Sequence, residues 1–260
     1  MILHYGWNKK YGKDIAKMKS LAKALNAVCI DDKLIKRADC NHCSVRKMML
    51  FSKLDIDKAS QLLWPIQNQR SPAKTLLYLQ GQPPHSLISI RRGFIKLTQS
   101  DKNGQERIVR LLGPGASAGL ETLLEKPYMQ TAEAITELDY CIIPVRTVLQ
   151  LEQSQPILYK ELQNQWQMQL KQADDWLSKL LMGTVKQRFC RFLLMQYDTQ
   201  KLPHKQIYLI SNQDIASILA TTEESVSRSV AELRKNGLLE RIERRLYRLD
   251  LAAIEKLANF

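Results

Sequence analysis

The sequence contains no apolar run of about 18 or more residues, the length that a membrane-spanning helix requires. It also has no signal-peptide pattern at its N-terminus. We therefore expect a cytoplasmic protein that has no membrane partner.

The motifs of several common enzyme classes are missing as well. The chain has no P-loop, no Gly-x-Ser-x-Gly, no His-Glu-x-x-His and no complete set of zinc ligands. One Cys-x-x-Cys, at Cys40 and Cys43, is weak evidence for zinc because no second ligand pair follows it. These absences predict that the chain is not an enzyme.

Cysteine is scarce, with five residues among 260. Because cytoplasmic thiols stay reduced, a disulfide framework is not expected. Three roles stay open for the cysteines: buried thiols, a metal or cluster site, or redox sensing. Cys190 stands beside Phe189 and Phe192 in a helical pattern, where we expect it to pack in a core.

Positive charge is plentiful but unevenly distributed. The net charge is +13; residues 1–53 hold 12 Lys and Arg against 4 Asp and Glu, and residues 185–260 hold 13 against 9. The excess near the C-terminus fits contact with phosphates. The larger N-terminal excess could be a nucleic-acid arm, although a solvated basic face is the commoner explanation.

Residues 72–155 show the pattern of many short strands separated by turn signals. Apolar runs occupy residues 75–79, 87–90, 94–97 and 108–112, and residues 132–137 and 140–145 are expected to add two more strands. Asp-Lys-Asn-Gly at residues 101–104 predicts a hairpin between two of these strands. The pattern favours an antiparallel β-barrel or roll over a parallel sheet.

A long helix is expected after Pro156, at residues 157–183. Its apolar residues recur at spacings of 4, 3, 4 and 3, as in a heptad seam. They are Trp166, Leu170, Ala173, Leu177 and Leu180. This period favours a partner helix from a second subunit, and packing of a lone amphipathic helix on its own barrel is the alternative.

Residues 211–250 carry the local signals of a winged helix-turn-helix. Ser211 and Thr222 are good N-caps for two short helices. Asn236-Gly237 stops the second helix. Residues 238–249 then alternate between apolar and charged, as an exposed two-stranded ribbon does.

The second of these helices predicts contact with double-stranded DNA, because an α-helix fits the major groove with its N-terminal side chains at base edges. Arg228 can bond guanine O6 and N7 together, and Glu224 can accept from a cytosine amino group. Taken singly, these residues would be ordinary solvated side chains. The helix caps, the short joint between the helices, the buried apolar stripe, the helix stop and the wing hairpin all agree with a DNA-binding helix-turn-helix. The predicted DNA-contacting residues are Thr222, Glu224, Ser225, Ser227, Arg228, Arg244 and Arg245.

The roll, long helix and winged helix together resemble the Crp/Fnr superfamily of bacterial transcription regulators, over about residues 40–260. The most specific part, Thr-Glu-Glu-Ser-Val-Ser-Arg at residues 222–228, resembles the recognition helix of the Fnr subgroup. In that subgroup Glu-x-x-Ser-Arg reads a TTGAT-type half-site, and the matching residues are Glu224, Ser227 and Arg228. Glu223 stands where the Crp subgroup has a base-contacting Arg.

The resemblance implies an α+β fold, a homodimer, and RNA polymerase as a further partner. The expected parts are a basic N-terminal segment with possible ligand cysteines (residues 1–53), a β-roll sensor domain (54–156) like cyclic-nucleotide-binding domains, a dimerisation helix (157–183) and a winged helix-turn-helix DNA-binding domain (184–260).

Cyclic nucleotides are not expected in the roll. In Crp proteins a Gly-Glu-Leu turn and a following Arg-Ser pair hold the cyclic phosphate. The corresponding residues are 115–122 and Gln130-Thr131, so the Arg is missing. Burying a phosphate without that cation is costly.

Fnr proteins sense oxygen with a [4Fe–4S] cluster, held by three cysteines before the roll and one inside it. Cys40 and Cys43 resemble the first pair, and Cys141 resembles the ligand within the roll. The remaining ligand should lie six residues after Cys43, where this chain has Met49, and a thioether is a poor ligand for iron. Cys29 is the candidate replacement, and His42 is a weaker one because it sits between two ligands and is expected to point away. The alternative is a set of reduced thiols that bind no metal.

Two other functions stay open. The same regulator could respond to haem with NO or CO, or to no cofactor, although no His or Met pair marks a haem pocket. A different class of function is a small-ligand-binding module that uses the roll pocket and reads no DNA.

Overall fold

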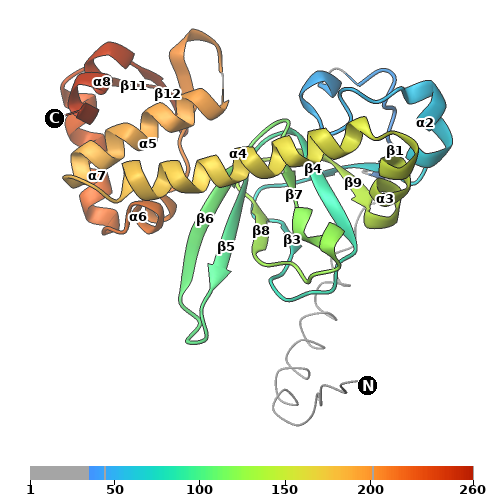
Figure 1. Cartoon of the computed structure of the whole chain (residues 1–260). Coiled ribbons are helices and arrows are strands. Elements are labelled where there is room, and N and C mark those ends of the chain that lie inside the picture. Colours follow the sequence, from blue (N-terminus) through green and yellow to red (C-terminus); the bar gives the residue numbers. More distant parts are fainter. Residues whose placement is uncertain (1–34, 44, 201, 260) are drawn as a thin grey trace. The chain divides into compact units, whose positions relative to one another are not determined.

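Two antiparallel sheets form the N-terminal domain, and a long helix connects it to a second, helical domain (Figure 1). The computed structural model describes residues 35–43, 45–200 and 202–259. Within it, Lys36–Phe260 form one compact unit. Most of the predicted basic N-terminal segment, including Cys29, lies outside the described residues.

The strands of the roll are ordered β1-β2-β9-β4-β7 in one sheet and β3-β8-β5-β6 in the other. Their bounds are β1 Ile35–Arg37, β2 Gln67–Ser71, β3 Leu76–Tyr78, β4 Ser86–Arg92, β5 Ile95–Ser100, β6 Glu106–Leu112, β7 Ser117–Ala118, β8 Thr131–Ala134 and β9 Leu138–Pro144. The pairs that β9 makes with β2 and β4, and that β5 makes with β6 and β8, are antiparallel. The predicted antiparallel roll is therefore confirmed.

The predicted hairpin joins β5 and β6. Asp101 accepts hydrogen bonds on its Oδ1 from the backbone N–H groups of Asn103 (2.8 Å) and Gln105 (2.9 Å). Gly104 closes the turn at a φ of 79°, in the left-handed region that favours glycine. Local turn chemistry thus sets the register of this edge pair.

Short helices cover one side of the roll. They are η2 Arg46–Met48, α2 Ile56–Leu63, η3 Leu120–Leu124 and α3 Val145–Ser154. Asp55 caps α2 by accepting from the backbone N–H of Lys58 at 3.3 Å. Buried residues of α2 and α3 pack with Cys141 and Ile143 of β9 in one hydrophobic cluster. This packing holds the cysteine-bearing strand beneath the helices.

The long helix α4, Ile157–Leu180, is fixed to the roll by glutamine side chains. The Nε2 groups of Gln165, Gln169 and Gln172 donate to the backbone oxygens of Gly115 (3.1 Å), Ser117 (2.7 Å) and Leu111 (3.0 Å), respectively. At spacings of four and three residues these glutamines share one helix face. The opposite side of α4 is left to solvent in a single chain.

The helix ends at Leu180, before Gly183, where the sequence pattern placed its end. Arg191 explains the earlier stop, because its Nη1 donates to the carbonyl oxygens of Lys179 (3.2 Å) and Met182 (2.7 Å). These carbonyls belong to the last turn and its extension, which lack partners within the helix.

The C-terminal domain contains α5 Val185–Gln200, η4 Pro203–Lys205, β10 Gln206–Tyr208, α6 Asn212–Leu219, α7 Glu223–Lys235, β11 Leu239–Glu243, β12 Leu246–Leu249 and α8 Leu251–Asn259. Its sheet has the order β10-β12-β11. Phe189, Cys190 and Phe192 are fully buried at its centre, so Cys190 has the packing position that the sequence suggested. None of the helices among the described residues is long and apolar enough to cross a membrane.

Candidate DNA-binding face and cysteine site

The helix-turn-helix is built by the local signals that the sequence displays. Ser211 caps α6 by accepting from the backbone N–H of Asp214 at 3.0 Å. Ala220, in the left-handed conformation at a φ of 49°, makes the turn. Thr222 then caps α7, accepting from the backbone N–H of Ser225 at 3.2 Å. Buried Val226 and Leu233 fix which face of α7 is turned inward.

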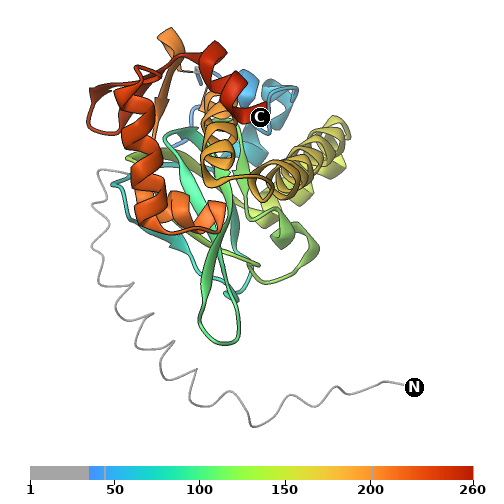
Figure 2. The same cartoon turned by 90° about the vertical axis from the view of Figure 1, so that its left-hand side faces the viewer.

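The outward face of α7 presents a carboxylate and a guanidinium side by side. Arg228 donates from Nη2 to Oε1 of Glu224 at 2.6 Å, and their side chains are 73% and 75% exposed. Ser227 is exposed next to them. The α7 helix lies at the surface of the end of the molecule that faces the viewer in Figure 2. A rigid helix thus carries these three groups to a surface that a DNA groove can reach.

Thr222 and Ser225 have a different place. Their hydroxyl oxygens are 2.9 Å apart at the start of α7, where they also serve the cap. The first turn of a helix has unpaired N–H groups and a partial positive charge, which suits a phosphate oxygen. Both residues thus lie at the N-terminal end of the predicted face.

The wing is the hairpin of β11 and β12, with Arg244 and Arg245 in its turn. Arg244 is exposed, whereas Arg245 is half-buried and has a φ of 66°. The carbonyl oxygen of Arg245 accepts from the backbone N–H of Leu209 at 2.7 Å, which ties the turn to the domain. Elsewhere in the wing, Arg248 is paired with Glu240 at 2.8 Å.

The cysteine predicted inside the roll lies in the middle of β9. Cys141 is buried and pairs in register with Asn68 of β2 and Ser89 of β4. Cys40 and Cys43 are half-buried in the loop after β1. Cys40 packs against the same hydrophobic cluster that contains Cys141.

His42, between the two loop cysteines, points elsewhere. Its Nδ1 lies 2.9 Å from Oδ2 of Asp39, and both side chains are exposed. The Oδ1 of Asp39 also accepts from the backbone N–H groups of Asn41 and His42, both at 3.1 Å. These bonds hold the pKa of Asp39 below its usual value. His42 is therefore a poor candidate for a ligand shared with the cysteines.

Burial disfavours the thiolate form of two of the cysteines. It raises the pKa of Cys141 to about 12 and also raises the pKa of Cys40. Arg91 opposes this for both thiols with its positive charge, and its Nη1 is paired with Oδ1 of Asp139 at 3.3 Å. Arg91 lies where the register of β4 against β9 shifts, between Ile90 and Arg92, and its charge acts on Cys141 from there, which sequence inspection had not revealed.

Met49 stands at the sequence position where a fourth cysteine ligand was expected, but it offers a thioether. It is buried, and its Sδ lies 3.9 Å from Oγ of Ser89, the cross-strand neighbour of Cys141. Cross-strand neighbours point to the same face of a sheet, so Met49 packs over the face that carries Cys141. Among residues 35–43, 45–200 and 202–259, no group of three or more His, Cys, Asp or Glu is arranged to hold a metal ion. The described residues alone therefore do not make a four-thiolate site.

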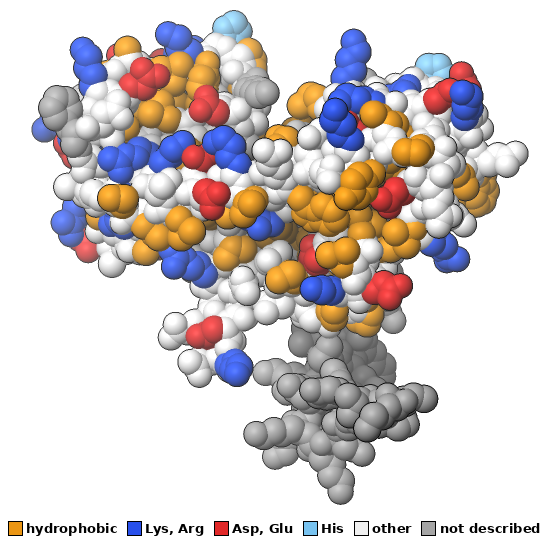
Figure 3. Space-filling model, viewed as in Figure 1, with side chains coloured by type: hydrophobic (Ala, Val, Ile, Leu, Met, Phe, Trp, Pro, Cys, Tyr) orange, Lys and Arg blue, Asp and Glu red, His pale blue; other side chains and the backbone are white. Residues whose placement is uncertain are grey.

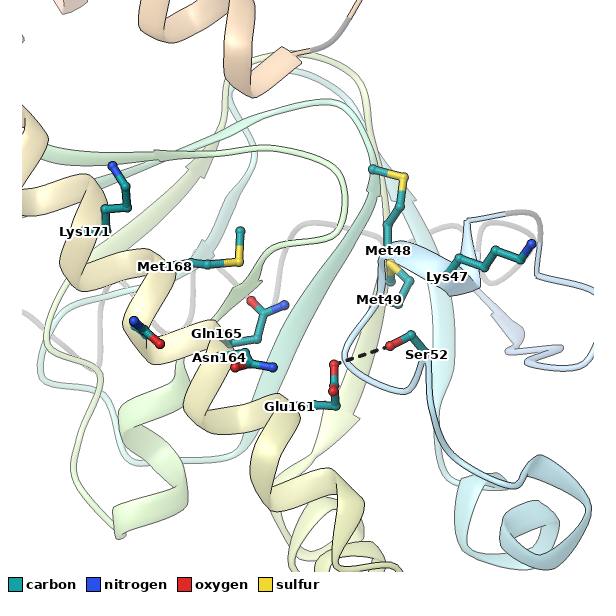
Figure 4. Close-up of a pocket in the computed structure, with 10 residues that line it drawn as sticks. Lys47, Met48, Met49, Ser52, Glu161, Asn164, Gln165, Met168 and Lys171 are labelled. Atoms are coloured by element: carbon teal, nitrogen blue, oxygen red, sulfur yellow. Dashed lines mark hydrogen bonds between the residues drawn. The ribbon is translucent and has the colours of Figure 1, made fainter.

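The segment after the cysteine loop is attached to α4, as the close-up in Figure 4 shows. Glu161 of α4 binds Nζ of Lys53 at 2.7 Å and accepts from Oγ of Ser52 at 3.5 Å. Ser52 and Glu161 border a pocket of about 450 Å³ between the segment and the helix, which Met48 and Met168 also line.

A pair of tyrosines packs in the interior of the roll. Tyr78 and Tyr128 are buried and stacked, with ring centroids 4.0 Å apart. Gln130, where Crp proteins have an Arg, is buried as well. A cation that sequence reasoning missed, Arg110 of β6, donates from Nη1 to Oε1 of Gln169 at 2.7 Å. Its guanidinium is thus bound by α4.

The predicted dimer seam is only partly exposed on α4. Leu170 and Leu177 are 63% and 64% exposed, and hydrophobic side chains are visible along the course of α4 in Figure 3. Trp166 and Ala173 are half-buried, with Trp166 packed on the roll's cluster. Leu180 is a correction: at 1% exposed it belongs to the core of its own C-terminal domain and is unavailable to a partner.

Comparison with known proteins agrees with this architecture. Residues 68–155 match the cyclic nucleotide-binding domain family, and residues 187–257 match the Crp-like helix-turn-helix domain family. The transcriptional regulator LdrP of Thermus thermophilus is 31% identical over 194 residues, covering 74% of this chain and 96% of LdrP. The transcriptional activator protein anr of Pseudomonas aeruginosa is 24% identical, covering 90% of this chain and 98% of its own.

A solved structure shows the same fold. FixK2 from Bradyrhizobium japonicum superposes with a TM-score of 0.67 at 21% identity, covering 74% of this chain and 96% of that one. The two matched ranges, residues 68–155 and 187–257, lie on either side of α4 in the sequence. The exposed face of α7 and the relatedness to LdrP lead to one conclusion: the chain belongs to the Crp/Fnr family, and it is a transcription regulator with a helix-turn-helix DNA-binding domain, not an enzyme.

Proposed function

We propose that the protein is a homodimeric, sequence-specific regulator that reads palindromic TTGAT-type half-sites in the cytoplasm. The observation that carries the proposal is the exposed group of Glu224, Ser227 and Arg228 on α7. Arg228 supplies two donors in a fixed fork for guanine, and Glu224 supplies an acceptor for cytosine. Their mutual ion pair keeps both groups extended from the helix before DNA arrives.

A second copy of the chain is required for a palindrome. Two recognition helices placed one turn of DNA apart by a twofold axis read inverted half-sites. The exposed leucines Leu170 and Leu177 of α4 supply an apolar strip for that partner. RNA polymerase is proposed as the partner of the DNA-bound dimer, on the basis of the family alone.

The DNA proposal is tested by gel-shift titration with a TTGAT–N4–ATCAA duplex and with a scrambled duplex of the same composition. We expect the palindrome to bind at least about a thousandfold more tightly, as specific sites generally do. Equal binding to both duplexes would contradict the proposal.

For the signal, we propose redox control through the thiols of Cys40, Cys43 and Cys141. Three thiols resemble three ligands of a [4Fe–4S] site, and the missing ligand is proposed to be Cys29. Such a cluster, when bound, supplies iron–thiolate bonds that join separate segments. The cysteine loop continues into the segment that Glu161 holds to α4, so a change in the loop has a direct route to the proposed dimer helix.

Anaerobic reconstitution with iron and sulfide tests this proposal. The parent is expected to gain broad visible absorbance and about four iron atoms per chain. Cys29→Ser and Cys141→Ser are expected to lose that absorbance, because each removes a ligand. Cys190→Ser is the matched control and should keep it, since Cys190 is buried in the other domain.

Two results would remove the cluster from the account. One is a colourless parent without iron, which leaves redox chemistry at free thiols or no signal at all. The other is full iron content in Cys29→Ser. A sharp absorbance band typical of haem in the purified protein would instead favour the haem version of the regulator. No cyclic nucleotide is proposed as an effector, because the cation expected at Gln130 is replaced and the tyrosine stack fills the interior.

A further inference from the structure

The roll and the DNA-binding domain share a hydrophobic cluster. Ile108, Leu111 and Ile135 of the roll are buried together with residues of the helix-turn-helix. The latter include Ile215 and Ile218 of α6. The backbone N–H of Ile108 also donates to Oγ of Ser217 in α6 at 3.5 Å. The first helix of the DNA-binding unit is therefore packed directly on the roll.

An ion cluster closes the edge of this contact. Lys96 of β5 places its Nζ 3.0 Å from Oδ1 of Asp214 in α6 and 3.5 Å from Oε2 of Glu133 in β8. All three side chains are less than 30% exposed. The other oxygen of Asp214 accepts from Oγ of Ser211, the cap of α6, at 2.6 Å. One carboxylate thus joins the start of the helix-turn-helix to the roll.

The wing reaches the same place. Arg244 and Arg245 line a cleft of about 670 Å³ together with Lys96, Glu133 and Asp214. The two arginines that were predicted to contact DNA phosphates therefore share a cleft with two carboxylates. Carboxylates that share a cleft with guanidinium groups attract them and compete with phosphate for them.

We propose that the ion cluster of Lys96, Glu133 and Asp214 is a latch that holds the DNA-binding domain on the roll in a resting arrangement, and that DNA binding draws the wing arginines out of this cleft. The inference rests on the proposed DNA-binding function. Interfaces between domains of one chain have the size and polarity of transient complexes, so such a contact can open. The negative duplex supplies the competing charge, and the latch lowers the affinity for DNA by the free energy of its own contacts.

The sign of the effect separates a latch from a phosphate contact. Lys96→Gln removes a positive charge, so a Lys96 that bound DNA phosphate would make the variant bind more weakly. A latch predicts the reverse, with roughly threefold to fivefold tighter binding of the palindromic duplex at low salt. Glu133→Gln is also expected to bind the palindromic duplex more tightly. It provides a second test of the latch if Lys96→Gln does not fold.

Matched controls correct for net charge. Lys102→Gln, in the exposed β5–β6 turn, and Glu125→Gln, at the exposed end of η3, make the same charge changes away from the cleft. The advantage of Lys96→Gln over Lys102→Gln should shrink as salt rises, because salt screens the latch in the parent. Trypsin should also cleave the connection between Lys179 and Lys186 faster in Lys96→Gln than in Lys102→Gln.

Binding of a folded Lys96→Gln or Glu133→Gln that is no tighter than that of its charge-matched control overturns the latch. Failure of the parent and all variants to prefer the palindrome contradicts the proposed function instead. In that case the trypsin comparison alone decides: faster cleavage of Lys96→Gln supports the latch, and equal cleavage overturns it.

Discussion

Arg228→Ala is expected to lose most of the preference for the palindromic duplex. Each bidentate contact with guanine contributes about 1–3 kcal/mol of discrimination, and a dimer makes it twice. Specific affinity should therefore fall by about thirtyfold or more. The substitution also leaves Glu224 without its partner at 2.6 Å, so an unpaired carboxylate faces the DNA. Titrations of cognate and scrambled duplexes with parent and variant measure the loss.

Arg234→Ala is the matched control. Arg234 lies in the last turn of the same helix and is exposed, so its removal changes the charge of α7 equally. It should lower the affinity for both duplexes by a similar small factor, as loss of a phosphate contact does. Equal loss of cognate binding in the two variants, or an unchanged preference in Arg228→Ala, would show that α7 does not read the bases as we describe.

Leu177→Asp is expected to dissociate the dimer. Leu177 is 64% exposed in one chain, and its burial against a partner would stabilise each subunit by about 1.5–3 kcal/mol. In a twofold seam the change removes two leucines and introduces two like charges. The dissociation constant should rise by at least about a hundredfold. Sedimentation over a range of concentrations measures this directly.

Met168→Asp controls for the introduction of a carboxylate on α4. Met168 is 67% exposed, and successive helical residues are rotated by about 100°, so it lies on the side of α4 opposite Leu177. This variant should dimerise like the parent. Dimerisation that survives Leu177→Asp but is lost in Met168→Asp would place the partner on the Met168 side of the helix, against the pocket shown in Figure 4.

The DNA-binding unit could be predicted almost to the residue, because its signals are local. Ser211 and Thr222 cap the helices that their sequence positions indicate. Gly237 adopts a φ of 73° where a helix-stopping glycine was expected. Caps, turns and stops depend on neighbours within a few residues, so one sequence contains all of their determinants.

For α4, the heptad pattern alone does not show which apolar residues are available to a partner. A heptad pattern identifies an apolar stripe but not the surface that covers it. Leu170 and Leu177 are exposed, whereas Leu180 is used by the core of its own chain. Telling these positions apart requires the placement of the roll and of α5, which lies beyond any local pattern.

Contacts between distant segments could not be predicted. Lys96 and Asp214 are separated by 118 positions, and neither stands in a motif. The effect of the Arg91 charge on Cys141 depends on the pairing of β4 with β9, including the register shift between Ile90 and Arg92. Met49 was identified as a departure from the ligand pattern, yet its position over Ser89 becomes visible only in the folded chain.

The central claim is that the two copies of α7 in a dimer read specific bases. Selection of duplexes from a random pool by the purified protein tests it without assuming a sequence. The account predicts enrichment of an inverted repeat of TTGAT-type half-sites by the parent and its loss with Arg228→Ala. Recovery of no shared motif, or of the same motif by both proteins, would contradict it.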